Sequence, residues 1–237
     1  MTDNQKYIYE LIYNQIKMGF ESLTETKIRI MECVIDNDFQ EDKISEKWVD
    51  KKIAEVYAEH LADSKTWQSL TTSQKLTKAF KQLCDMNIIA LHFAGYTTSD
   101  GKYEVAEVER KLRKKGLKPD GYCFYHEQDL SRAINGDKPN LYLAFNKCNN
   151  NDEALTVEIG KKIVAVLKEN GLEVNWEESA TQKIQIINFR WQQIYKKKNY
   201  YYFIVFSNIN LILSLVNQNF KKEPKLLSLN SIFAIRL

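Results

Sequence analysis

The side chains with the most chemical capability gather where an aromatic, apolar run of the sequence stops. Residues 121–125 read Gly-Tyr-Cys-Phe-Tyr, and residues 126–129 follow at once as His-Glu-Gln-Asp. A second histidine, His92, closes an earlier apolar run that begins at Ile88. If the two runs are neighbouring parallel strands, both imidazoles lie at the carboxyl edge of a sheet, where open α/β sheets usually bind ligands.

Two kinds of chemistry are compatible with these residues. His92, His126, Glu127 and Asp129 could act as an acid–base group, because imidazole and carboxylate side chains exchange protons readily. His92, His126 and Asp129 could instead hold a zinc or iron-type ion, with Asp100 joining from across a turn. No HExxH or HxH spacing supports the metal. The plainer interpretation, which the sequence favours, is that His126 caps a strand and Asp129 N-caps the short helix that follows.

Three weaker signals have plain explanations. Cys123 could be a nucleophile, but a cysteine in mid-strand among aromatic residues is usually buried and inert. Asp100-Gly101 opens a helix, yet an aspartate there repels phosphate, and no GxGxxG or Walker pattern is present. A basic cluster lies in the last turns of that helix, where cations complement the helix dipole; it comprises Arg110, Lys111, Arg113, Lys114, Lys115 and Lys118. The sequence therefore carries no specific signal for nucleic acid.

Composition is that of an ordinary globular protein. The 237 residues are 44% hydrophobic and 27% charged, with a net charge of +3. That charge is too small to indicate nucleic acid by itself. The four cysteines form no CxxC pair and the first residues are polar, which predicts reduced thiols and a cytoplasmic protein. No cofactor is identified by any motif.

The first 70 residues predict a helical region. Apolar residues recur at helical spacing from Ile8 to Ile16, with Asp3 as the expected N-cap. Further helices are predicted over Glu25–Ile35 and from about Ser45. Thr71-Thr72-Ser73-Gln74 matches a capping box, which predicts the start of another helix.

Strand and helix patterns alternate from residue 71 to residue 198. Helical patterns end at Gly116 and Gly171, and a short helix is expected over Asp129–Ile134. We predict an α/β fold, with α+β as the alternative, in which a mixed, partly parallel sheet of about five strands is covered by helices. Leu143 should lie in its core. The predicted strands are Ile88–Phe93, Tyr122–His126, Leu141–Phe145, Leu172–Trp176 and Lys183–Phe189.

The tail, residues 199–237, is atypical. Residues 200–216 are rich in aromatic and aliphatic side chains, and lysines flank them. A tail anchor is conceivable, but about 17 residues is the lower limit for a span. Asn208 and Asn210 would also lie near its centre. The alternatives are a strand pair or helix packed on the domain, or a tail supplied by a frame change or read-through.

Several stretches resemble a bacterial family of uncharacterised proteins, defined as a domain of unknown function. The similarity extends over roughly residues 71–195 and implies no activity, cofactor or catalytic residue. The family pattern favours Gly where this chain has Asn146, a residue that also tolerates left-handed backbone. The resemblance rests on Ile-Ala-Leu-His-Phe-Ala-Gly-Tyr at 89–96, Ser-Asp-Gly at 99–101, Gly-Tyr-Cys-Phe-Tyr-His-Glu-Gln-Asp-Leu-Ser-Arg-Ala-Ile at 121–134, Leu-Tyr-Leu-Ala-Phe at 141–145, and the helix leading to Gly-Leu-Glu-Val-Asn-Trp at 171–176.

Three functions are compatible with these patterns. The first is a soluble cytoplasmic binding or interaction module of the immunity-protein or stress-accessory kind, with a protein partner. It is indicated by the lack of a complete catalytic motif and by an edge bearing Tyr122, Tyr125, Glu127 and Asp129. The second is a small metal-dependent or acid–base enzyme that uses the histidines and carboxylates described above. The third is a tail-anchored protein held in a membrane by residues 200–216.

Overall fold

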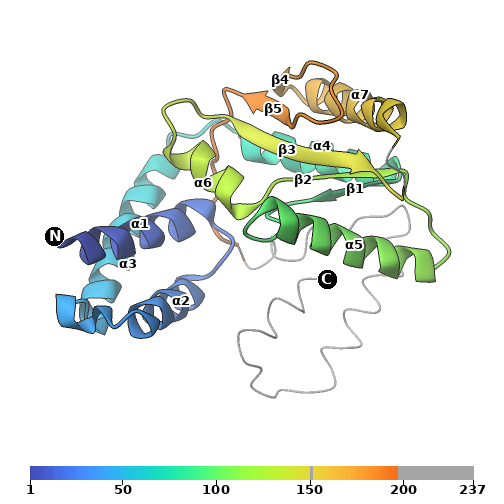
Figure 1. Cartoon of the computed structure of the whole chain (residues 1–237). Helices are drawn as coiled ribbons and strands as arrows, with labels where there is room; N and C mark the ends of the chain where they lie inside the picture. The colour runs from blue at the N-terminus through green and yellow to red at the C-terminus, as the bar shows by residue number, and fades with distance from the viewer. Residues whose placement is uncertain (150–151, 197–237) are drawn as a thin grey trace.

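The computed structural model describes residues 1–149 and 152–196, and a five-stranded sheet lies at its centre (Figure 1). The spatial order of the strands is β1-β2-β3-β5-β4. β1 and β2 are parallel, and the other neighbouring pairs are antiparallel. The predicted mixed, partly parallel sheet is thus confirmed. The strands are β1 (Ile88–Leu91), β2 (Gly121–Phe124), β3 (Leu141–Lys147), β4 (Glu173–Asn175) and β5 (Ile184–Ile187).

Helices cover both faces of the sheet. α4 (Thr72–Asp85) and α7 (Glu153–Glu169) pack on one face, and α5 (Thr98–Lys114) packs on the other (Figure 1). Successive side chains of a strand point to opposite faces. In β2, Cys123 therefore joins the core under α4 and α7, whereas Phe124 joins the core under α5. α6 (Glu127–Asn135) follows β2 directly.

Three helices and a short 3-10 helix at the N-terminus enclose a core of their own. This core consists of apolar residues from α1, α2 and α3, including Ile12, Ile30 and Val49. The N-cap of α1 is Thr2 rather than the expected Asp3, because the Thr2 hydroxyl accepts the backbone N–H of Gln5. The elements are α1 (Asp3–Met18), α2 (Leu23–Asp36), η1 (Phe39–Asp42) and α3 (Glu46–Ser64).

An extended segment after β5, residues 189–196, connects the sheet to the N-terminal helices. Trp191 Nε1 and Gln193 Nε2 donate to backbone carbonyls at the end of α1, at 2.9 and 3.0 Å. The Gln193 carbonyl lies 2.8 Å from His60 Nε2 of α3. Gly19 has a φ of +66°, and a Cβ there would lie 2.9 Å from the Gln193 oxygen. Glycine at this position therefore allows the segment to approach.

Leu143, predicted to lie in the core, has no solvent exposure in β3. Replacing Leu143 with alanine should lower the free energy of unfolding by about 2–5 kcal/mol, because the truncation leaves a cavity. Chemical denaturation would measure the loss. Tyr103→Ala is the control, since Tyr103 is 71% exposed and surface changes usually stay within about 0.5 kcal/mol. A loss below about 1 kcal/mol for Leu143→Ala would contradict its place in the core.

The predicted tail, residues 199–237 with the apolar run 200–216, lies outside the described residues. Across residues 1–149 and 152–196, no helix combines the length and apolar character that crossing a membrane requires.

Candidate functional site

His126 links β2 to α6 and is itself the N-cap of that helix. Its Nδ1 accepts the backbone N–H of Asp129 at 3.2 Å. The expectation that Asp129 would be the N-cap is wrong, because an imidazole nitrogen takes the acceptor role that an aspartate oxygen usually fills. Asp129 is instead the third residue of α6, and its carboxylate is directed elsewhere.

The Asp129 carboxylate lies in a buried network with Lys183, which immediately precedes β5. Lys183 Nζ lies 2.8 and 3.0 Å from its two oxygens, and His126 Nε2 lies 3.0 Å from Oδ2. Thr98 Oγ1, at the start of α5, is 3.0 Å from the same Nε2. His126 and Asp129 are 2% and 1% exposed. We call these four residues the buried charge network.

Hydrogen bonding decides the charge state of Asp129. Burial by itself raises the pKa of this carboxyl, but hydrogen bonds from His126 and Lys183 outweigh burial and leave the pKa below its usual range. Because His126 Nδ1 accepts an N–H, the proton of a neutral ring is assigned to Nε2, which faces Asp129. Both ring nitrogens are therefore engaged within the protein.

His92 occupies the opposite face of the sheet. The register pairs Leu91 with Phe124, so His92 is level with Tyr125, and His126 is one residue further along. A one-residue offset reverses the face to which a side chain points. His92 Nδ1 accordingly lies 2.9 Å from the Tyr125 hydroxyl on the α4 side. The structure thus brings His126 and Asp129 together and leaves His92 outside that group.

Burial also determines the protonation of His92. Desolvation lowers the pKa of its imidazole to about 3, so the ring is neutral at pH 7. It packs on Phe80 of α4 at a ring-centroid distance of 4.4 Å. Across the described residues, no three or more His, Cys, Asp or Glu side chains are grouped so that they could hold a metal ion.

The predicted acidic and aromatic edge is mostly covered. Tyr125 and Asp129 are 0% and 1% exposed. Glu127 accepts a hydrogen bond from Gln15 of α1 at 3.1 Å. Tyr122 is half-buried and stacks on Phe124 with ring centroids 6.1 Å apart. The four residues hold elements together more than they face solvent.

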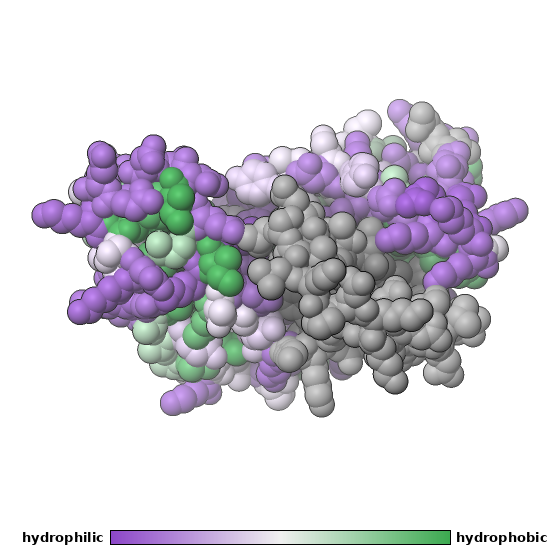
Figure 2. All heavy atoms as spheres, turned by 90° about the horizontal axis from the view of Figure 1, so that it is seen from below, coloured by the Kyte–Doolittle hydropathy of each residue, from purple (hydrophilic) through white to green (hydrophobic). Residues whose placement is uncertain are grey.

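The weaker sequence signals also have structural explanations. Burial raises the pKa of the Cys123 thiol well above its usual value, which opposes a nucleophilic role. Arg110 pairs with Glu107 at 2.7 Å and Arg113 with Glu109 at 2.8 Å, so the basic cluster on α5 is partly neutralised. Hydrophilic residues cover this part of the molecule (Figure 2, right).

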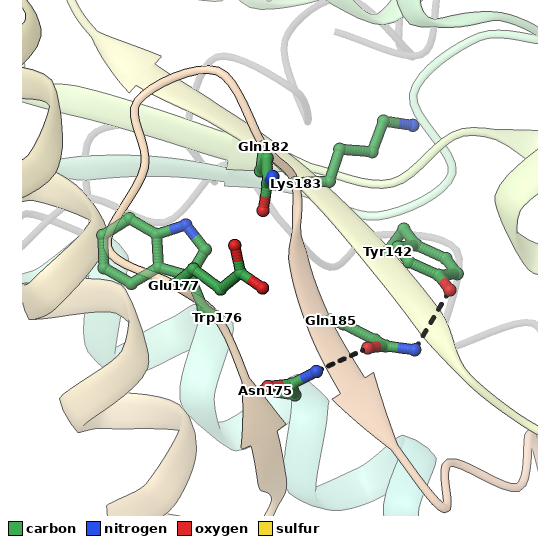
Figure 3. A pocket seen from close by; sticks show the side chains of 7 residues that line it. All are labelled: Tyr142, Asn175, Trp176, Glu177, Gln182, Lys183 and Gln185. Carbon is green, nitrogen blue, oxygen red and sulfur yellow. Dashed lines mark hydrogen bonds between the residues drawn. The ribbon is translucent and has the colours of Figure 1, made fainter.

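Lys183 also lines a pocket of about 390 Å³ at β3, β4 and β5. None of the lining side chains was predicted to belong to a site, because they come from three strands and a loop. The only sequence signal is that Lys183, just before β5, and Gln185 within it alternate with the buried Ile184 and Ile186. The lining residues are Tyr142, Asn175, Trp176, Glu177, Gln182, Lys183 and Gln185 (Figure 3).

A row of hydrogen bonds crosses the floor of the pocket. Asn175 Nδ2 donates to Gln185 Oε1 at 3.2 Å, and Gln185 Nε2 donates to the Tyr142 hydroxyl at 3.0 Å (Figure 3). The pairing of β2 with β3 ends at Phe124 and Ala144, and continuing it by two residues places His126 opposite Tyr142. Continuing the pairing of β3 with β5 by one residue places Lys183 opposite Ala144. The pocket therefore adjoins the buried charge network.

Trp176 forms one wall of the pocket and rests on α7. Its ring meets Phe145 edge-on with centroids 5.4 Å apart, and its Nε1 donates to the Ser179 carbonyl at 3.1 Å. A Cβ at Gly160 would overlap the six-membered ring of Trp176. Glycine at position 160 therefore allows this wall to stand where it does.

Gly160→Ala should lower the free energy of unfolding by about 1–3 kcal/mol, because it overpacks the contact between α7 and Trp176. It should also shift the indole N–H resonance of Trp176. Denaturation and an NMR spectrum would measure the two effects. Lys162→Ala, an exposed change on the same helix, is the control. An unchanged stability together with an unchanged indole signal would contradict the close contact.

Residues 1–195 match the model of a family described as Domain of unknown function (DUF6891). The chain belongs to this family. The match begins at residue 1, whereas the resemblance read from the sequence began at about residue 71, so α1–α3 lie inside the family region. No curated protein and no solved structure matches the chain.

Proposed function

We propose that this member of the DUF6891 family is a binding module that recognises a protein partner through the pocket at β3, β4 and β5. The pocket is the observation that supports the proposal. Ligand sites combine an apolar or aromatic wall with a few hydrogen-bonding groups in fixed positions. Here Trp176 supplies the wall, while Asn175, Gln185 and Tyr142 form the hydrogen-bonded row.

The buried charge network serves this module as a support. Both nitrogens of His126 are engaged, and the Asp129 carboxylate is matched by Lys183. Lys183 immediately precedes the strand that carries Gln185. By tying Lys183 to α6, the network fixes the position of β5 and therefore the floor of the pocket.

Affinity capture from a cell lysate tests the proposal with the full-length protein. The pocket variant is Tyr142→Phe/Gln185→Ala, which removes two hydrogen-bonding groups from the floor. The control is Tyr103→Ala, an exposed change on α5. We expect a stoichiometric protein partner to be retained by the wild type and the control and to be lost by the pocket variant. Equal retention by the pocket variant, or no stoichiometric partner at all, would count against this function.

An acid–base or metal-dependent enzyme is the second candidate. The observation that favours it is the buried 3.0 Å contact between His126 Nε2 and Asp129, since carboxylates orient catalytic imidazoles in this way. Enzyme chemistry through His126 predicts an activity loss of about 10²–10⁴-fold in His126→Asn, a change that keeps a good N-cap residue. Elemental analysis of the wild type beside His92→Ala/His126→Ala would report any metal. If metal content and every detectable activity were unchanged, the enzyme proposal would be abandoned.

A tail anchor through residues 200–216 remains a separate prediction, as does the cytoplasmic location. Cell fractionation of the full-length protein beside a 1–198 truncation would test both. Full-length protein found only in the soluble fraction would remove the anchor.

A further inference from the structure

We propose that the pocket at β3, β4 and β5 binds the guanidinium group of an arginine side chain presented by the protein partner. This inference rests on the proposed binding function and names the chemistry of what the same pocket recognises. Three features support it: the charge of the lining, the orientation of its hydrogen-bonding groups, and its aromatic wall.

The lining carries one negative charge that the described residues leave unmatched. Lys183 is the only cation of the lining, and its ammonium group is paired with Asp129 at 2.8 Å. Glu177 forms none of the ion pairs found within residues 1–149 and 152–196, whereas the adjacent Glu178 pairs with Lys161 at 3.4 Å. The pocket therefore favours a cation, and the Glu177 carboxylate is its natural counter-charge.

The orientation of the amides makes the pocket rich in acceptors. Asn175 and Gln185 each use their side-chain N–H group within the row, where Gln185 donates to Tyr142. The Gln185 oxygen accepts from Asn175, so the row leaves the Asn175 side-chain oxygen to face a ligand. In Figure 3 the Glu177 carboxylate and the Gln182 side-chain oxygen point toward the middle of the pocket. A guanidinium group has five N–H donors and no acceptor, so it complements such a lining.

The aromatic wall favours a guanidinium over a compact ammonium. Tryptophan attracts cations over its ring more strongly than other aromatic side chains do. Guanidinium is planar, weakly hydrated and able to stack on such a ring, whereas ammonium is compact and strongly hydrated. Trp176 lines the pocket beside Glu177, which places the aromatic wall and the carboxylate within reach of one ligand group.

NMR titration of the full-length, ¹⁵N-labelled protein tests the inference. The probes are three capped tripeptides, Gly-X-Gly with acetylated and amidated ends, in which X is arginine, citrulline or lysine. Citrulline has nearly the shape of arginine but lacks its charge. We expect the arginine peptide to shift the Trp176 indole signal and the side-chain amides of Asn175 and Gln185. We expect affinity to be at least about tenfold weaker for citrulline and severalfold weaker for lysine.

A matched pair of variants localises the effect. Glu177→Gln should weaken binding of the arginine peptide by about tenfold, whereas Glu178→Gln should change it less than about threefold, because Glu178 does not line the pocket. Equal binding of the arginine and citrulline peptides, equal effects of the two variants, or no binding would overturn the inference. Stronger binding of the lysine peptide would replace guanidinium with ammonium as the ligand.

The two tests fail in different ways. A captured partner that depends on Tyr142 and Gln185, together with no binding of the arginine peptide, would keep the binding function and reject the guanidinium. Selective arginine binding without any stoichiometric partner would keep the site and reject the function as a protein-binding module.

Discussion

Replacing Lys183 with methionine is expected to lower the free energy of unfolding by about 3–5 kcal/mol at pH 7. Asp129 is 1% exposed, and without Lys183 its buried carboxylate would keep only the more distant Arg132, at 3.5 Å and largely exposed, as a permanently charged partner. Removing one member of a buried ion pair leaves an uncompensated charge, which costs more than removing both members. Urea denaturation of the variant beside the wild type would measure the difference.

The second variant in this test, Lys183→Met/Asp129→Asn, also removes the negative charge of Asp129. Adding Asp129→Asn to Lys183→Met should restore part of the lost stability, since no carboxylate is then buried unpaired. Lys102→Met is the matched control, because Lys102 is exposed on α5 and should cost less than about 0.5 kcal/mol. A loss for Lys183→Met no larger than that of Lys102→Met would show that the network does not stabilise the fold.

The pH dependence of the same variant has a defined sign. In the wild type the pKa of Asp129 is lowered by folding, so its contribution to stability is present above the unfolded-state pKa and is lost as pH falls through the folded-state value. In Lys183→Met the ammonium no longer lowers that pKa and the hydrogen bond from His126 alone opposes burial, so less of this stability is lost as pH falls. The difference in the free energy of unfolding between the wild type and Lys183→Met should therefore become smaller as pH falls.

His92 should make the protein strongly sensitive to acid. Folding lowers the pKa of His92 from 6.5 to about 3, so the unfolded chain binds the proton more tightly between these values. Each pH unit in that window lowers the free energy of unfolding by roughly 1.4 kcal/mol, which accumulates to about 5 kcal/mol by pH 3. No loss from His92 is expected above about pH 7.

Comparison with His92→Phe isolates this effect. Phenylalanine keeps an aromatic ring beside Phe80 and cannot be protonated, although it leaves the Tyr125 hydroxyl without its 2.9 Å partner. We expect the variant to be less stable than the wild type at pH 7 and to lose stability with acid less steeply. Denaturation at several pH values from 7 to 4 would measure both slopes. Parallel slopes would mean that His92 is protonated in the folded protein near its ordinary pKa.

Local patterns in the sequence determined most of the secondary structure. The Thr71–Gln74 capping box starts α4, as predicted, because both reciprocal hydrogen bonds form between residues three apart. Gly116 and Gly171 follow the ends of α5 and α7 with φ values of +80° and +73°, the left-handed backbone that glycine adopts without strain. Such signals act within one helical turn, so a single sequence suffices to find them.

The candidate site could be predicted only in part from such local patterns. His126 and Asp129 were predicted to share a site and are in contact, because they are three residues apart on one helix start. His92 and His126 were expected together, but the register of β1 and β2 offsets them by one residue and places them on opposite faces. Register is a property of the pairing between two strands and is not encoded in either strand alone.

The sequence by itself thus determined most helices and strands, several of the caps and the existence of a mixed sheet, whereas the N-caps of α1 and α6 were predicted one and three residues away from their true positions. Only the tertiary structure decided that Lys183 reaches Asp129, 54 residues earlier in the chain, and that residues of three strands and a loop line one pocket. The physical reason is the range of the interactions. Caps and amphipathic periodicity are local, whereas ion pairs and pockets depend on strand order and register, which arise only when the whole sheet is assembled.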